Sequence, residues 1–382
     1  MTLTRTTGLL LLAIGPLLAH HSLTAAYDDK KPTTVKGMVF KFEWTNPHVQ
    51  IYVDSPASLG QVTRWQIEFD DTLGLTKAGW EPGSVKQGDL ITAEGVLARD
   101  GSKQIFGKTV TLPGGKKLAA AARDLSALPL RTTFNGPPAP KWPNGHVRLG
   151  TPPGQKGYWA DASPGGLYES SAGNLRMNRE GLLANLSDSA KVAPFQPWAK
   201  ALYEYRQRSQ FKEDPMAFCL PPGGPRQFQD RLGLQIVEQP DRNRIFIMSG
   251  GANRNWRLIY TDGRPLPVIE EVTPTYYGYS VGQWEGDTLV TRTLAFAERF
   301  WFSNGGLPHT ENLKLTERIS RPDLNTLKYE VTVDDAGAYT RPWTGGMTLG
   351  WVGGQDLQEY FCDDNNKETE HLSGKHTDGK SK

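Results

Sequence analysis

The chain has 382 residues, of which 37% are hydrophobic and 22% are charged, and this composition is typical of a globular protein and excludes a disordered one. Its 43 Lys and Arg residues nearly balance its 41 Asp and Glu residues. Because there is also no long basic run with interleaved aromatic residues, we expect no nucleic-acid partner. The length allows two ordinary domains, and 41 glycines with 27 prolines favour many turns and short strands over long helices.

The N-terminus has the pattern of a bacterial secretion signal. One positive charge at Arg5 precedes the apolar run GLLLLAIGPLL, which is shorter than the ~20 residues that span a bilayer but long enough for a signal-peptide core. Cleavage after Ala19 would leave His20 as the first residue, whereas cleavage after Ala26 fits the small-residue rule better and would remove both histidines of the HHS motif. We therefore predict a periplasmic or secreted bacterial protein that has no membrane span after cleavage.

The two cysteines, Cys219 and Cys362, support export. An oxidising compartment favours their pairing, and neither belongs to a C-x-x-C redox motif. A bridge between them would close a long loop and could stabilise the fold by up to roughly 5 kcal/mol in the chain-entropy model. We predict an intrachain disulfide, and the alternative is a pair of free buried thiols.

Residues 33–118 contain short segments with rough period-two alternation, separated by turns. In one of them, Val49, Ile51 and Val53 share one face while the intervening side chains share the other. Five such segments with one helical interruption near residues 72–79 predict a small closed barrel of the oligonucleotide/oligosaccharide-binding (OB) type. The predicted strands are VKGMVFKFEW, HVQIYVD, TRWQIEF, DLITAEGVLA and KTVTLPGG.

Residues 119–214 are predicted to form a Pro/Gly-rich linker that contains one amphipathic helix near residues 197–209. In this helix Trp198, Leu202 and Tyr205 follow the i, i+4, i+7 spacing of a single apolar stripe. A proline near the start of the segment suits the first helical turn. We expect the helix to pack across an open side or end of the next domain.

Residues 215–366 are predicted to form a second, larger β domain, followed by a polar and disordered tail at 367–382. Turn markers separate its strands, and no helices of 10–15 residues lie between them, which excludes a parallel α/β sheet. We predict an antiparallel, lipocalin-like β-barrel, with a two-sheet β-sandwich as the alternative. The clearest strands are RIFIM, NWRLIYTDG, DTLVTRTLAF, ENLKLTERIS and TLKYEVTVDD.

Two sets of motifs resemble known families. The segments LAHHS, EWTNPH, IYVD, TAEG and ARDGS resemble a family of secreted bacterial domains of unknown function. The segments PFQPWAKALYEYRQ, GQWEGDTLV and YTRPW resemble a second uncharacterised β-rich domain. Neither resemblance implies an activity. In the first family the histidine doublet stands directly after the cleavage site, so the resemblance implies a signal peptide at residues 1–19.

The histidines near the N-terminus raise the possibility of a copper site. If His20 is the first residue, its α-amine and imidazole can chelate Cu(II), which favours planar nitrogen ligands. His21 could add a second imidazole, and His48 of the WTNPH motif a third. The chain lacks the Cys and His spacings of zinc sites. The alternative, which we favour, is a solvated terminal pair and a turn histidine, so we assign no cofactor.

Aromatic and ionisable residues gather at the strand ends of the second β domain. No G-x-S-x-G elbow or phosphate-binding glycine loop occurs, which argues against a hydrolase. A small barrel with an incompletely filled interior can hold one apolar ligand, oriented by a few polar groups. We predict that one or both of Arg257 and Glu317 face this interior, since their neighbours are apolar. The predicted ligand-binding residues are Arg257, Tyr279, Trp284, Trp301, His309 and Glu317.

These observations favour a protein that binds a small, partly apolar ligand in its C-terminal barrel. One alternative is a lyase- or isomerase-like enzyme, in which a desolvated Glu317 works as acid or base beside His309. A second is periplasmic copper binding through the N-terminal histidines. A third is that the aromatic residues only fill a core, with both charges pointing to water. We leave catalysis, ligand identity and oligomeric state unassigned.

Overall fold

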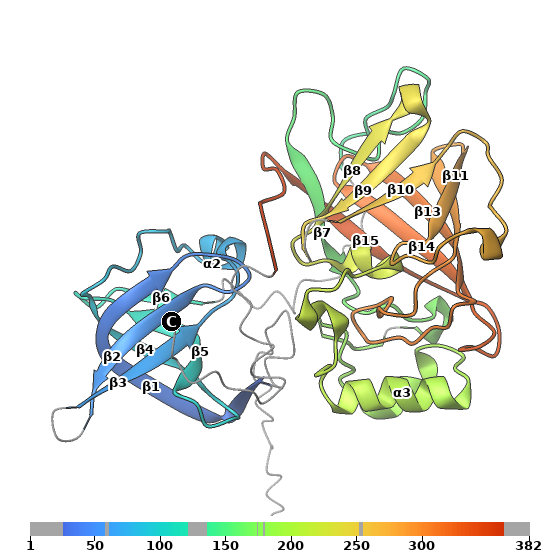
Figure 1. Ribbon diagram of the computed structural model, residues 1–382. Helices are drawn as coiled ribbons and strands as arrows, with labels where there is room; N and C mark the ends of the chain where they lie inside the picture. Colours follow the sequence, from blue (N-terminus) through green and yellow to red (C-terminus); the bar gives the residue numbers. More distant parts are fainter. Residues whose placement is uncertain are drawn as a thin grey trace, which may run out of the picture.

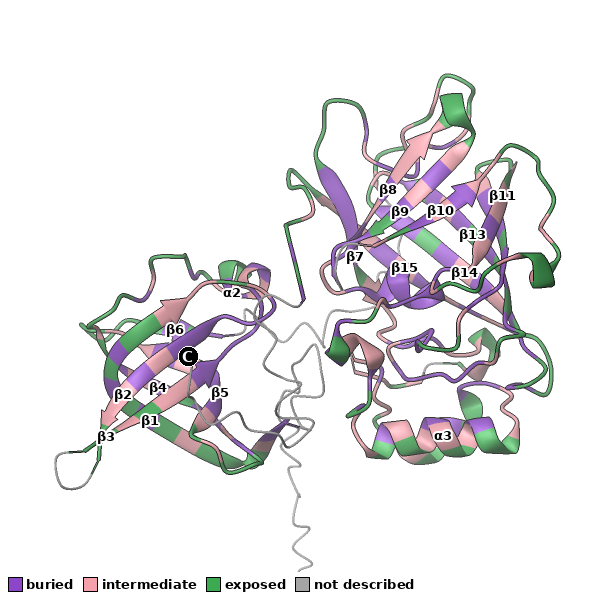
Figure 2. Cartoon of the chain, viewed as in Figure 1, coloured by how far each residue is buried: buried purple, intermediate pink, exposed green. Residues whose placement is uncertain are grey.

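The computed structural model describes residues 26–57, 61–120, 136–173, 175–178, 180–251 and 255–362. They form two β-rich units, each with its own hydrophobic core (Figures 1 and 2). Within these ranges, no helix combines the length and the apolar character that crossing a membrane requires. The predicted signal peptide and the predicted C-terminal tail lie outside the described residues.

The first unit, here called the small barrel, has six strands in the order β3-β2-β1-β4-β5-β6. A parallel pairing of β3 with β5 joins the two sides, so that β1 to β5 pair around a closed ring. This confirms the predicted five-stranded OB-like barrel, to whose β5 the short β6 is added. The elements are β1 (Tyr27–Glu43), β2 (Gln50–Pro56), β3 (Val62–Glu68), α2 (Thr72–Lys77), β4 (Leu90–Ala98), β5 (Gln104–Thr111) and β6 (Lys117–Ala119).

The core of the small barrel follows the alternation seen in the sequence. Val49, Ile51 and Val53 are fully buried, as predicted. Gly107 lies against the ring of buried Phe69, and a Cβ at this position would come within 2.2 Å of that ring. The sheet therefore needs a glycine at the point where the aromatic ring fills the barrel.

The second unit, here called the large barrel, is a closed ring of nine strands in the order β10-β11-β12-β13-β14-β15-β7-β8-β9 (Figure 1). Closure confirms the predicted barrel over the alternative sandwich. The strands are β7 (Gly157–Ser163), β8 (Leu234–Gln239), β9 (Arg244–Ser249), β10 (Trp256–Tyr260), β11 (Tyr279–Glu285), β12 (Thr288–Leu294), β13 (Lys314–Asp323), β14 (Thr326–Asp334) and β15 (Trp343–Gly353).

Strand β7 comes from the segment 119–214 that the sequence predicted as linker. It pairs with β15 on one side and with β8 on the other, so the barrel closes through it. Its first four residues are all buried, so the strand lacks the polar-apolar alternation that marks the others. This segment is therefore part of the fold and not only a connection.

The neighbouring strands β10 and β11 run parallel, with Ile259 opposite Ser280 and Tyr260 opposite Val281. The other pairings in this barrel are antiparallel. Parallel neighbours cannot be joined by a hairpin. After β10 the chain must therefore run back to the end of the barrel at which β10 began before β11 can start. We call residues 261–278 the crossover. It is a departure from the predicted antiparallel meander.

Helix α3 (Pro197–Arg208) lies beside one end of the large barrel, which confirms the predicted helix (Figure 1). The predicted apolar stripe is wrong, because Trp198 and Tyr205 are each 46% exposed. The buried face of the helix instead contains Gln207, because its amide donates hydrogen bonds to the backbone carbonyls of Gly181 and Gly305 in two loops. The buried residues of the helix are Ala199, Tyr203 and Gln207.

A short 3-10 helix, η6 (Gly224–Gln229), fills the interior of the large barrel. All six of its residues are buried. Phe228 stacks on Tyr329 of β14 with ring centroids 4.0 Å apart, and Gln227 donates a hydrogen bond to the carbonyl of Ile247 on β9. Because β14 and β9 lie on opposite sides of the ring, η6 acts as a plug. The other 3-10 helices are η3 (Ser170–Ala172), η4 (Leu186–Lys191), η5 (Pro215–Phe218), η7 (Pro240–Arg242) and η8 (Ile269–Glu271).

Candidate functional site

Arg257 and Glu317 form a buried ion pair inside the large barrel. Their side chains are fully shielded from solvent, so both face inward as expected. Arg257 Nη1 lies 2.8 Å from Glu317 Oε1, and Nη2 donates a second hydrogen bond to Oε2. This two-pronged geometry is the strongest that Arg and a carboxylate form.

Neighbouring hydroxyl groups complete this polar network. The Tyr329 hydroxyl donates to Glu317 Oε1 over 2.7 Å, and burial raises the pKa of that phenol well above its ordinary value. Arg257 also donates to Thr293 Oγ1 at 2.7 Å and to Ser280 Oγ at 3.0 Å. Phe228 of the plug stacks on Tyr329, so the network is buried beneath the plug and its charged groups are paired with protein groups.

The structure does not bring the other predicted ligand residues to this pair. Three of them lie in separate aromatic contacts among the described residues, and none of these contacts includes Arg257 or Glu317. The contacts are Tyr279 with the ring of Tyr260 (5.4 Å), Trp284 with the ring of His146 (5.0 Å) and Trp301 with the guanidinium of Arg206 (4.5 Å).

His309 occupies a loop before β13 and is 9% exposed. Its Nδ1 lies 3.1 Å from the carbonyl of Thr310, and its Nε2 lies 3.0 Å from the carbonyl of Phe300. Burial lowers the pKa of the imidazole. Because the described partners of His309 are backbone carbonyls, and those of Glu317 are Arg257, Thr293 and Tyr329, the predicted acid–base pair is not assembled.

His48, the third residue of the predicted copper set, is buried in the small barrel with 2% of its surface exposed. Its Nδ1 lies 3.1 Å from the carbonyl of Phe69 and 3.3 Å from Glu68 Oε1. His20 and His21 lie outside the described residues. Within the described part of the chain, no three His, Cys, Asp or Glu side chains are grouped as metal ligands. The copper site stays a prediction.

A cavity of about 250 Å³ lies between the crossover and the strands β11 and β12. We call it the crossover groove. Thr291 and Thr293 are buried on the inner side of β12, so Arg292 between them points outward into this groove. The groove is thus on the outer face of the barrel. Its principal side chains are the apolar Leu266, Val281 and Val290 and the polar Arg264, Gln283 and Arg292.

The two arginines of the crossover groove differ in whether a carboxylate neutralises their charge. Arg264 is paired with Asp262, with Nη2 2.6 Å from Oδ2, and this hydrogen bonding lowers the pKa of the Asp262 carboxyl. Arg264 Nη1 also donates to the hydroxyl of Tyr279. Arg292 has no carboxylate within ion-pair distance among the described residues. The groove therefore offers one uncompensated positive charge beside an apolar floor.

The sequence interpretation missed Arg292 and the crossover residues. Alternation in DTLVTRTLAF places Val290 and Arg292 on one face of the strand, so the sequence alone could have shown that these two side chains lie together. The alternation could not predict that β10 and β11 pair in parallel, and it is this pairing that brings Leu266 of the crossover over that face.

A second, water-sized cavity of about 10 Å³ lies beside Asp230 and Arg231. Both Asp230 oxygens accept backbone hydrogen bonds, from the N–H groups of Leu232 at 2.9 Å and Gly251 at 2.8 Å. Burial nevertheless raises the pKa of this carboxyl to about 6. The cavity has room for a single water and not for a ligand.

Comparison with known families and proteins bears on the N-terminal region alone. A search of curated proteins found no match. The resemblance of the C-terminal motifs to a second domain stays a prediction. The first resemblance is confirmed, because residues 9–106, which contain β1 to β4, match the model of a "Family of unknown function (DUF6152)".

Proposed function

We propose that the protein binds a small, partly apolar molecule with an anionic group in the crossover groove. The observation that carries this proposal is the uncompensated Arg292 beside Leu266, Val281 and Val290 in a cavity of about 250 Å³. The anionic group pairs with the guanidinium, and the apolar part covers the floor. The ligand site remains on the C-terminal barrel but moves from its interior to its outer face, because the buried plug occupies the space beside Tyr329 and the Arg257–Glu317 pair.

The chemistry of the groove sets the expected strength of each contact. An ion pair at an exposed arginine contributes about 0.2–1 kcal/mol, so Arg292 orients the ligand more than it holds it. Apolar burial contributes roughly 25 cal/mol per Å² and supplies the remaining affinity. A ligand with both features is therefore preferred over a free inorganic anion.

An aromatic sulfonate, anilinonaphthalene sulfonate, is a suitable probe of the crossover groove. We expect saturable fluorescence enhancement with the wild-type protein. Arg292→Glu is expected to weaken binding by about two- to thirtyfold, since an attraction of about 0.2–1 kcal/mol becomes a repulsion of similar size. The matched control is Arg242→Glu, an exposed arginine on another loop whose side chain is 66% accessible, and it should bind the probe like wild type.

A neutral probe with the same rings, phenylnaphthylamine, separates charge from apolar contact. It is expected to bind more weakly than the sulfonate and to be insensitive to Arg292→Glu. Equal sulfonate affinity in the Arg292 and Arg242 variants would exclude the groove as the binding site.

We further propose that the protein is exported to the periplasm or beyond. Two observations support export: the Cys219–Cys362 disulfide, which persists in oxidising compartments, and the position of Tyr27. This buried residue begins β1 directly after the second candidate cleavage site. Cleavage at either site would leave β1 whole, but only cleavage after Ala19 keeps the buried Ala26, whose carbonyl accepts a hydrogen bond from the Arg99 N–H at 2.9 Å.

The intact mass of the protein secreted by a bacterial host tests export. We expect a mass that corresponds to cleavage after Ala19 or Ala26, reduced by two hydrogens for the disulfide. A full-length cytosolic product with two alkylatable thiols at Cys219 and Cys362 would contradict both export and pairing in the cell.

A further inference from the structure

We infer that the disulfide builds a docking platform on the large barrel, and that the small barrel undocks when this bond is absent. The docking platform comprises the segments around Cys219 and Cys362 together with Arg231, Leu232, Glu359 and Tyr360. Figure 1 shows the chain after β15 leaving the large barrel toward the small one.

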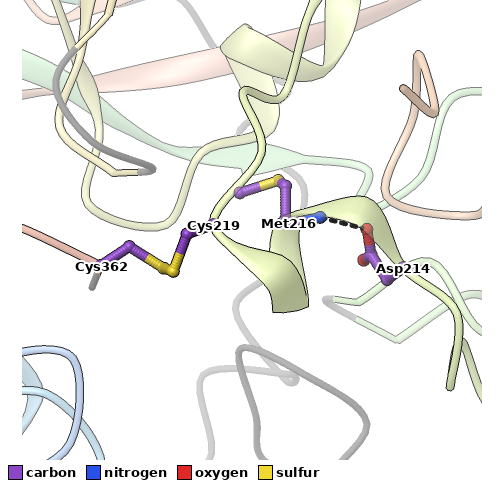
Figure 3. The surroundings of a disulfide bond; sticks show 4 residues. All are labelled: Asp214, Met216, Cys219 and Cys362. Atoms are coloured by element: carbon purple, nitrogen blue, oxygen red, sulfur yellow. Dashed lines mark hydrogen bonds between the residues drawn. A yellow bond between two sulfur atoms is a disulfide. The ribbon is translucent and has the colours of Figure 1, made fainter. Parts of the chain in front are cut away.

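The disulfide joins two segments that are distant in sequence. Cys219 directly follows η5, and Cys362 lies 143 residues later (Figure 3). The helix η5 is capped by Asp214, whose carboxylate accepts a hydrogen bond from the Met216 N–H at 3.0 Å. Cys219 is thus attached to an ordered turn. Through the disulfide it holds Cys362 and with it the segment 354–362 that follows β15.

A small hydrophobic cluster surrounds this bond. Cys219, Tyr360 and Cys362 are 7%, 6% and 2% exposed, and Leu232 packs against them. This cluster is separate from the cores of both barrels. Residues 354–362 contain neither helix nor strand, so ordering them costs about 1–2 kcal/mol of backbone entropy per residue. The bond and the cluster fix the far end of this segment, while its start is held by the Gly354 N–H on the Lys156 carbonyl at 3.0 Å and by the ion pair of Asp356 with Lys156 at 3.1 Å.

The polar groups that meet the small barrel adjoin the cluster. The carbonyl of Glu359, next to Tyr360, accepts a hydrogen bond from Asn46 Nδ2 at 3.1 Å. Arg231, next to Leu232, places its Nη2 3.9 Å from Asp70 Oδ1. Displacing the cluster would therefore remove the Glu359 contact directly. It would also take away the packing of Leu232 beside Arg231, although the Asp230 hydrogen bonds to Leu232 and Gly251 still hold that turn.

On the small barrel, the matching groups are held without help from the disulfide. Asn46 Oδ1 accepts hydrogen bonds from the N–H and the hydroxyl of Thr72, each at 3.0 Å. Asp71 caps α2 by accepting from the Gly74 N–H at 2.7 Å. Asp70 lies next to this cap and is 4% exposed. This surface is preformed, so loss of the disulfide disturbs the platform and not its partner.

The junction has the features of a reversible interface. The separation of 3.9 Å between Asp70 and Arg231 exceeds a hydrogen bond, and the contact of Asn46 with Glu359 is a single hydrogen bond to a backbone carbonyl. A polar interface that leaves two hydrophobic cores separate is expected to open and close. The disulfide shifts that balance toward the docked form.

The test uses the full chain and compares Cys219→Ser/Cys362→Ser with the wild type by small-angle X-ray scattering and hydrogen exchange. We expect a larger radius of gyration and faster amide exchange at residues 355–361, with unchanged protection in α2, β13 and β14. Reduction of the folded wild type by a dithiol, which gives up two electrons and two protons to form the two thiols, should cause the same changes.

A second variant keeps the proposal testable if the cysteine variant does not fold. Asp70→Lys places a positive charge against Arg231 with the disulfide intact, and it should undock the barrels as well. The matched control, Asp287→Lys, alters an acid that is 54% exposed on the large barrel and should leave scattering unchanged. If Asp70→Lys undocks the barrels while reduced wild type stays docked, the platform does not depend on the disulfide and the inference is overturned.

Discussion

Glu317→Gln is expected to lower the free energy of unfolding by about 3–5 kcal/mol, because it leaves the charge of Arg257 buried without a counter-ion. Both side chains are fully shielded from solvent, so water cannot replace the lost carboxylate. The Tyr329 hydroxyl also loses its charged acceptor. Urea unfolding monitored by tryptophan fluorescence measures the change.

The matched control for this variant is Glu285→Gln in the same barrel. Glu285 pairs with Arg318 at 2.9 Å, but the two side chains are 47% and 44% exposed. We expect a loss below about 1 kcal/mol there, because an exposed ion pair is screened by water. Replacing the buried pair together, as Arg257→Met/Glu317→Leu, should recover most of the stability lost in Glu317→Gln. Equal losses in the two single variants would show that the interior pair is hydrated.

Phe228→Ala is the second change with a large expected effect, a loss of about 3–5 kcal/mol in the free energy of unfolding. The ring is fully buried in the interior of the large barrel, and it stacks on Tyr329 at 4.0 Å. Truncation removes the apolar contacts and leaves a void that the closed ring of strands cannot collapse to fill. Chemical denaturation of wild type and variant measures this loss.

Phe218→Ala is the matched control for Phe228→Ala, since Phe218 is 43% exposed and lies ten residues earlier in the chain. Its truncation is expected to change stability by no more than about 0.5 kcal/mol. If both phenylalanine variants lost the same amount, η6 would not be packed inside the barrel, and the interior would again be open as a ligand site.

The sequence predicted the strands whose two faces differ in polarity. In β14, Leu327, Tyr329, Val331 and Val333 are buried and alternate with less buried residues, as the pattern indicated. The same holds for β2 and for much of β13. Period-two alternation is a local property of the chain, and a strand with one face in a core must display it. The cysteine pairing was predictable for a different reason, since only two cysteines are present.

Elements whose burial is set by distant residues escaped the sequence interpretation. Strand β7 begins with four consecutive buried residues and therefore shows no alternation. In α3 the buried face contains Gln207, because loop carbonyls far away in sequence accept its hydrogen bonds. A polar residue that finds its partners only in the folded chain looks like a surface residue in the sequence.

By itself, the sequence determined that this protein consists of two β-rich units, that Arg257 and Glu317 lie among apolar neighbours, and that Cys219 and Cys362 would pair. Only the tertiary structure decided which cavity the large barrel offers for the proposed ligand. The plug fills the interior that the strand pattern left open, and the parallel pairing of β10 with β11 creates the outer groove. Both depend on contacts between segments far apart in the chain, which no local pattern encodes.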